Sequence, residues 1–155
     1  MCGKKIIMSE NNVKELYRII HRQDIKKIEN FIEKYGIDNT ESNPDERTLL
    51  MFATIENQQK LVKFLIEQRA NLNQQDQSGF TALHFAVFEN NFEIVKLLTA
   101  SGCDVHIQDH QGNSALWRSV MLTDQYSTIS KFLISNGADI YLKNRHGVCP
   151  HDLFT

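Results

Sequence analysis

The sequence predicts an all-α fold in which similar helical units stack into a solenoid. A short pattern recurs with a spacing of 33 residues, and each copy opens a short apolar segment. A second apolar segment follows each copy and ends at a turn. A spacing of this length is typical of stacked repeats, in which neighbouring units complete each other's core. We therefore expect residues 1–155 to form one repeat domain.

The start of each unit is marked by a hydroxyl side chain. Thr48, Thr81 and Ser114 are separated by 33 residues each, and Cys149 follows 35 residues later. A Thr or Ser at this place accepts a hydrogen bond from a backbone N–H group of the first helical turn. We therefore expect first helices to begin near residues 49, 82 and 115.

The unit at residues 76–108 has the clearest pattern. Leu83 and Ala86 are three residues apart and face one side of the first helix. Asn90 and Asn91 form the turn to a second helix, whose residues 94–98 carry a broad apolar stripe. Gly102 ends that second helix, because glycine adopts left-handed backbone angles at little cost.

The same pattern divides the rest of the chain. Residues 10–42 form a degenerate N-terminal cap repeat, residues 43–75, 76–108 and 109–143 are full repeats, and residues 144–155 are a truncated C-terminal repeat. Glu46 and Arg69 stand where other units have glycine, at an expected cost of about 1 kcal/mol each. The unit at 109–143 has two extra residues, which fall within 121–128.

These motifs resemble those of the ankyrin repeat family. The stretch "GFTALHFA" at residues 79–86, with Asp76 before it, matches the family pattern D-x-x-G-x-T-P-L-H-x-A. The closing turns "GCDV" and "GADI" also match, whereas Leu49, Ala82 and Ala115 replace the family's proline. The resemblance implies an ankyrin-type solenoid with projecting hairpin loops and a non-catalytic role in binding other proteins.

Composition excludes several other classes of function. The net charge of −2 and the pI near 6.3 give no general attraction to nucleic acid or to anionic membranes. No apolar run is long enough to span a bilayer. Three cysteines without a CxxC pattern indicate a reducing compartment. We expect a cytoplasmic protein that is monomeric when free and has no nucleic acid or membrane partner.

The sequence shows no pattern of catalytic or metal-binding residues. The resemblance implies that His84 is a structural hydrogen-bonding residue. Four further histidines fall on turns near repeat boundaries, and no cysteine or carboxylate cluster completes a metal site around them. Phosphate-binding and dinucleotide-binding loops are absent. We expect no enzymatic activity, no cofactor and no metal.

The expected binding surface is the concave face, formed by the loop tips and the first helices. Phe80, Phe88 and Met121 occupy positions that point outward, where large apolar groups often act as binding hot spots. Trp117 is open to two interpretations, as a binding residue or as one that packs between repeats. The candidate partner-binding residues are Arg47, Ile55, Glu56, Gln77, Phe80, Phe88, Glu89, His110, Asn113, Trp117, Arg118 and Met121.

Three hypotheses about function remain. The first is a protein–protein interaction module, whose partner carries a basic rim because residues 37–93 hold four Lys/Arg against nine Asp/Glu. The second hypothesis is a special case of the first, a stand-alone inhibitor such as a bacterial toxin immunity protein, because this role suits a small array. The alternative to such an inhibitor is an adaptor or host-directed effector subunit. The third hypothesis is an enzyme or metal protein. The convex helices and the basic first repeat are weaker candidates for the binding surface.

Overall fold

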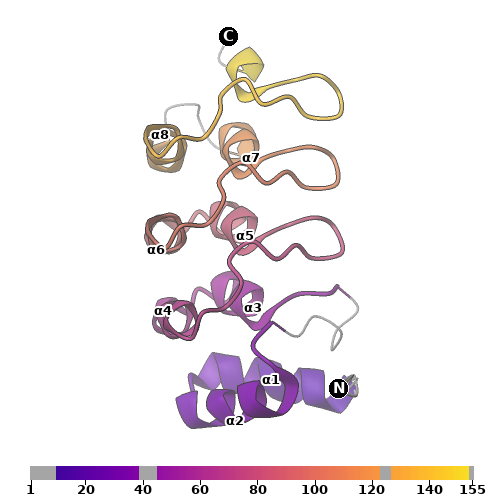
Figure 1. Ribbon diagram of the computed structural model, residues 1–155, viewed down its shortest axis with the longest axis vertical. Helices are drawn as coiled ribbons and strands as arrows, with labels where there is room; N and C mark the ends of the chain where they lie inside the picture. The colour runs from indigo at the N-terminus through magenta and orange to yellow at the C-terminus, as the bar shows by residue number, and fades with distance from the viewer. Residues whose placement is uncertain (1–9, 39–44, 123–126, 154–155) are drawn as a thin grey trace.

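The computed structural model describes residues 10–38, 45–122 and 127–153, which form a stack of paired helices (Figure 1). These residues contain α-helices and one short 3-10 helix, with no strand among them. The prediction of an all-helical solenoid is therefore confirmed. The elements in chain order are α1 (Glu10–Arg22), α2 (Ile25–Tyr35), α3 (Leu49–Ile55), α4 (Gln59–Glu67), α5 (Ala82–Phe88), α6 (Phe92–Ala100), α7 (Ala115–Leu122), α8 (Thr128–Ser135) and η1 (Pro150–Leu153).

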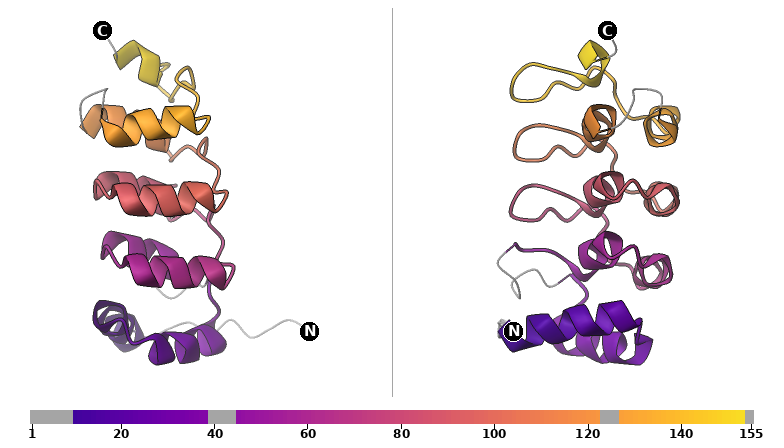
Figure 2. Two further views of the ribbon diagram at one scale, coloured as in Figure 1. Left: turned by 90° about the vertical axis from the view of Figure 1, so that its left-hand side faces the viewer. Right: turned by 180° about the vertical axis from the view of Figure 1, so that it is seen from behind.

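The helices form two columns. The inner helices α3, α5 and α7 lie beside the hairpin loops, and the outer helices α4, α6 and α8 form the opposite side (Figure 1). The hairpin loops all project in the same direction, away from the outer helices (Figure 2). The predicted starts at residues 49, 82 and 115 are the observed first residues of the inner helices.

Side-chain caps fix the starts of the helices, as the sequence pattern predicts. Thr48 Oγ1 accepts from the N–H of Met51 at 3.3 Å, and Ser114 Oγ accepts from the N–H of Trp117 at 3.2 Å. Asn91 caps α6 in the same way by accepting from the N–H of Ile94. Each such cap is worth about 1 kcal/mol, because it satisfies a backbone donor that the helix leaves free.

The core runs continuously between the two columns. Each inner helix contributes at least one buried leucine, and so does each outer helix. Burial of one such side chain contributes about 1.5–3 kcal/mol. A small buried residue follows three positions after each inner leucine. The inner leucines are Leu50, Leu83 and Leu116, the outer ones are Leu65, Leu98 and Leu133, and the small residues are Ala53, Ala86 and Ser119.

The hairpin loops share one turn geometry. In two of them a buried aspartate oxygen accepts hydrogen bonds from two backbone N–H groups. In the first of these loops, Asp76 accepts from the N–H groups of Ser78 and Phe80. Asp109 does the same in the next loop, and Asn144 in the loop after that. This side-chain turn pre-shapes each loop before it meets its neighbour.

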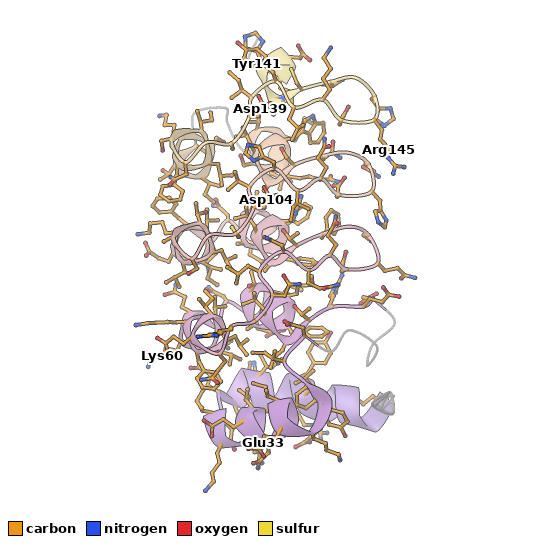
Figure 3. All side chains as sticks on the ribbon, viewed as in Figure 1. Glu33, Lys60, Asp104, Asp139, Tyr141 and Arg145 are labelled. Carbon is orange, nitrogen blue, oxygen red and sulfur yellow. The ribbon has the colours of Figure 1, made fainter. Side chains whose placement is uncertain are left out.

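Backbone hydrogen bonds then join each loop to the next. The N–H of Gln77 donates to the Asp45 carbonyl at 2.9 Å, and the N–H of His110 donates to the Ser78 carbonyl at 3.0 Å. The N–H of Arg145, which lies at the tip of the last loop, donates to the Gln111 carbonyl at 3.0 Å (Figure 3). The loops therefore form one continuous edge.

Two departures from the repeat pattern keep the backbone geometry of the glycine they replace. Glu46 has φ 57° and Arg69 has φ 65°, both in the left-handed region. Gly102 and Gly137, which end the next two outer helices, have φ 85° and φ 90°. The expected strain at Glu46 and Arg69 is therefore present. Most of the predicted insertion, at residues 123–126, lies outside the described residues.

We expect Arg69→Gly to leave the protein equally stable or to stabilise it by up to about 1 kcal/mol, because glycine relieves the left-handed strain. The exposed Arg69 side chain makes no ion pair among the described residues. Denaturant unfolding of the variant and the wild type measures the difference. A clear loss of stability would contradict the prediction.

Gly79→Ala should destabilise the protein much more than Gly102→Ala. Both glycines have left-handed angles, at φ 83° and φ 85°, so each substitution brings about 1 kcal/mol of backbone strain. A Cβ on Gly79 would also lie 2.6 Å from the His110 nitrogen in the next loop, whereas nothing lies within 4 Å of one on Gly102. We expect a further loss of about 2 kcal/mol for Gly79→Ala.

Denaturant unfolding of the two variants, side by side, measures that difference. Equal losses would show that the contact between the loops relaxes without cost.

Candidate functional site

The surface between the hairpin loops and the ends of the inner helices is called the inner face here; it corresponds to the predicted concave face. The inner helices α3, α5 and α7 place equivalent residues on this face near their C-terminal ends: Ile55 and Glu56, Phe88 and Glu89, and Met121 and Leu122. His21 and Arg22 end α1, and His21 Nδ1 lies 3.8 Å from Glu56 Oε2.

A cluster of aromatic rings occupies the middle of the inner face. Phe80 in the hairpin loop packs edge-on against Phe85 and Phe88 of α5, with ring centroids 5.8 Å and 5.2 Å apart. Arg118 of α7 places its guanidinium 5.4 Å from the Phe80 ring and 5.6 Å from the Phe88 ring. The Trp117 ring lies 5.7 Å from the same guanidinium. Phe80 and Phe88 are therefore half-buried rather than fully outward as predicted.

An ion pair holds Arg118 over this cluster. Its Nε donates to Asp109 Oδ2 at 3.0 Å, and the side chains are 19% and 1% exposed. Burial alone would raise the pKa of Asp109, but hydrogen bonds from the Asn113 and Gln111 backbone and from Arg118 outweigh it and lower the pKa. Asp109 thus stays ionised and fixes the guanidinium over the rings. Part of Arg118 remains accessible to a partner.

Arg47, in the loop before α3, also combines a ring contact with carboxylate partners. Its guanidinium lies 5.0 Å from the Phe85 ring, 3.4 Å from Asp45 and 3.5 Å from the buried Asp76. Arg47 is half-buried and already has carboxylate partners within the chain. A partner protein would therefore meet one edge of Arg47.

His84 is a buried structural residue that joins two repeats. Its Nδ1 accepts from the N–H of Thr81 at 3.2 Å, and its Nε2 donates to the Asn113 carbonyl at 3.2 Å. These bonds require the neutral tautomer with the proton on Nε2. Burial lowers the pKa of His84, and only the bond to Asn113 and two distant carboxylates oppose this shift. The geometry matches the structural role that the resemblance implies.

The prediction that Asn113 lies at an exposed loop tip is wrong. Its side chain is 2% exposed, because the next loop covers it. Asn144 donates to Asn113 Oδ1 at 2.9 Å, and the Asn113 N–H donates to Asp109. Asn113 therefore holds neighbouring loops together and is not available to a partner.

The other predicted residues lie on the inner face with different degrees of exposure. Met121 is 53% exposed, and its neighbour Leu122 is equally exposed. Trp117 is half-buried, and its indole N–H is buried without an acceptor among the described residues. Both interpretations of Trp117 thus stay open. The predicted residues that are exposed are Gln77, Glu89, His110 and Met121. Ile55 and Glu56 are half-buried, as are the predicted residues of the aromatic cluster and its arginines.

Sequence reasoning treated the basic first repeat only as a weaker candidate and named no residue at this N-terminal end of the inner face. Tyr17, Arg18, His21 and Arg22 of α1 line a cavity of about 380 Å³ together with Glu56 of α3. The signal is a change of charge just before the turn between the two helices of a unit. Arg22 precedes the left-handed residue Gln23, whereas Glu56 and Glu89 precede Asn57 and Asn90.

The described residues offer little for catalysis. Nowhere among residues 10–38, 45–122 and 127–153 do three His, Cys, Asp or Glu side chains gather in a way that could hold a metal ion. The thiol of Cys103 is buried, and burial raises its pKa to about 11. This thiol therefore stays protonated near neutral pH and is a poor nucleophile. No helix within these same stretches is both long and apolar enough to cross a membrane.

The stack of paired helices with projecting loops defines the chain as a helical-repeat solenoid. The sequence model described as "Ankyrin repeats (3 copies)" matches residues 13–109, which is more than half of the chain. The chain therefore belongs to the ankyrin repeat family, whose repeats generally serve as protein–protein interaction modules. No curated protein shows a significant match to it.

Acidification should weaken the fold through His84. The unfolded pKa of histidine is about 6.5, and the folded pKa lies below that value, so the unfolded state binds the proton first. Stability is full above about pH 6.5 and falls as the pH drops through the interval between the two pKa values.

The test compares unfolding free energies at about pH 7.5 and about pH 5.5 for the wild type and His84→Met. Met51 occupies the equivalent position in the preceding repeat and accepts the N–H of Thr48 there, so methionine suits the site without titrating. The variant should lose less stability on acidification than the wild type. An unchanged pH dependence would show that His84 is not the source of the effect.

Proposed function

We propose that this protein binds a protein partner through its inner face, and that it does so without catalysis. The observation that carries the proposal is an apolar stripe at one repeat position, formed by Ile55, Phe88 and Met121. Met121 is exposed, and Ile55 and Phe88 are half-buried, so each presents apolar surface to solvent. Apolar groups at the centre of a surface commonly act as binding anchors.

The charges beside the stripe indicate what kind of partner fits. Glu56 and Glu89 follow the stripe residues in two successive units, and Glu89 is exposed. A partner with basic side chains next to its apolar contacts would match this edge. Such charge complementarity mainly speeds association and makes it sensitive to salt.

The rigidity of the inner face also supports its proposed role as the binding surface. The Asp109–Arg118 pair and the ring contacts hold Phe80 and Phe88 in place before any partner arrives. Binding to a pre-organised surface loses less side-chain entropy than binding to a mobile one. The inner face is thus suited to tight binding over a modest area.

The biological role of such binding takes one of two forms. An inhibitor, such as a toxin immunity protein, occupies the functional site of its partner and abolishes the partner's activity. An adaptor or a host-directed effector subunit leaves that activity intact and brings the partner to another molecule. An activity assay of the partner with and without this protein distinguishes the two.

Phe88→Ala and Trp117→Ala should each weaken binding by about 2 kcal/mol or more if these residues are anchors. Affinity capture of the partner from the native organism, followed by calorimetric titration, measures the effect. Trp117→Ala needs an unfolding control, because loss of the ring could instead loosen the stack. Phe92→Ala is the matched control, since Phe92 is a half-buried aromatic residue on the outer helix α6. It should leave binding unchanged.

A double variant, Phe80→Ala with Phe88→Ala, provides the decisive result. If it folds and keeps full affinity for the partner, binding does not involve the inner face.

A further inference from the structure

The cavity at the N-terminal end of the inner face has the chemistry of an anion site. Arg18 and Arg22 lie one helical turn apart on α1 and line the cavity together with His21 and Glu56. The Glu56 carboxylate lies 3.8 Å from His21 Nδ1, which leaves the two arginines for a further anion. The cavity volume of about 380 Å³ falls at the lower end of the range for ligand pockets. Because Glu56 also borders the apolar stripe, the cavity is continuous with the surface proposed to bind the partner.

The two guanidinium groups are only partly neutralised within the described chain. Arg18 lies 3.6 Å from Glu15, in a pair whose side chains are both more than half exposed. Exposed pairs of this kind contribute little and exchange readily. Arg22 makes no ion pair with any described residue, and it precedes a left-handed turn residue, as Glu56 and Glu89 do in later units. The sign of the charge thus reverses along the inner face.

The dipole of α1 explains only part of the basic cluster formed by Arg18, His21 and Arg22. His21 and Arg22 lie in the last turn of α1, where a cation interacts favourably with the helix dipole. Arg18 lies a turn earlier, where that effect has faded, and two like charges four residues apart destabilise a helix slightly. The pair therefore has a small cost for the free protein that an anion would remove.

Tyr17 gives the cavity an apolar wall and a further donor. Its ring packs edge-on against Phe52 of α3, with centroids 4.9 Å apart, and the residue is 39% exposed. Burial is the largest effect that raises the pKa of Tyr17, so the hydroxyl keeps its proton at neutral pH. A carboxylate in this cavity would find two guanidinium groups, which bind such oxygens in a bidentate manner.

We propose that this cavity receives an acidic side chain of the protein partner, so that the partner docks in one orientation. Its carboxylate lies against Arg18 and Arg22, its apolar side chains follow the stripe from Ile55 to Met121, and its basic side chains face Glu89. The inference rests on the proposed function and adds to it the orientation in which the partner binds.

A phage-displayed library of random peptides, selected on the folded protein, tests the orientation without knowledge of the natural partner. Selected peptides are then synthesised and titrated by fluorescence anisotropy. We expect an enriched acidic residue toward one end of the peptides. Arg18→Gln with Arg22→Gln should weaken their binding about fivefold or more at low salt. Changing the peptide's acidic residue to its amide should weaken binding equally, and the two changes together should not add.

The matched control is Lys60→Gln with Lys63→Gln, which removes the same charge from exposed positions on the outer helix α4. Lys60 lies at the outer edge of the stack, on the side opposite the hairpin loops (Figure 3). This variant should bind the peptides as the wild type does. An equal loss of affinity in the control would show that only net charge matters, and would overturn the proposal.

The remaining outcomes separate this inference from the proposed function. Peptides that need Phe88 but bind equally well after the two arginine substitutions would overturn the acidic contact and leave the inner face as the binding surface. Peptides that need neither Phe88 nor the arginines, or no selected peptides at all, would overturn both.

Discussion

The close stacking of one hairpin loop on the next is the constraint on which the rest of the structure depends. The N–H of His110 reaches the Ser78 carbonyl at 3.0 Å, and this spacing leaves no room for a side chain on Gly79. The loop must therefore be pre-shaped, which Asp76 achieves by accepting two backbone N–H groups. Because each loop fixes where the next one begins, the inner helices follow with a constant offset, and the apolar faces of neighbouring units meet in register.

The inner face inherits its rigidity from these loops. Asp109 serves the loop turn with one oxygen and Arg118 with the other, so the same residue shapes the loop and positions the cation over the aromatic rings. His84 connects the same loop to α5 through the Asn113 carbonyl. A single buried network thus joins the fold to the candidate binding surface. Substitutions in it should change stability and binding together, which is why each binding experiment needs an unfolding control.

Differences between the repeats determine how charge and apolar groups are distributed over the inner face. Positions that the repeat leaves outward hold Ile55, Phe88 and Met121 in successive units, and the residue before the turn between the two helices changes from Arg22 to Glu56 and Glu89. Because a solenoid places equivalent positions side by side, such changes become a spatial pattern of charge and apolarity. The pattern has a direction, and a partner that matches it has one preferred orientation.

The sequence by itself determined the repeat length, the starts of the inner helices and the left-handed turns. These depend on local interactions, such as the cap formed by Thr81 and the backbone freedom of Gly102. Only the tertiary structure decided which loop residues are accessible. Asn113 was predicted at the surface but is covered by Asn144, and Phe80 is covered by Arg118. These contacts join residues 31 and 38 positions apart in the numbering, and they depend on how far one unit is rotated and shifted against the next. That placement is a property of the packed stack, and no single repeat contains it.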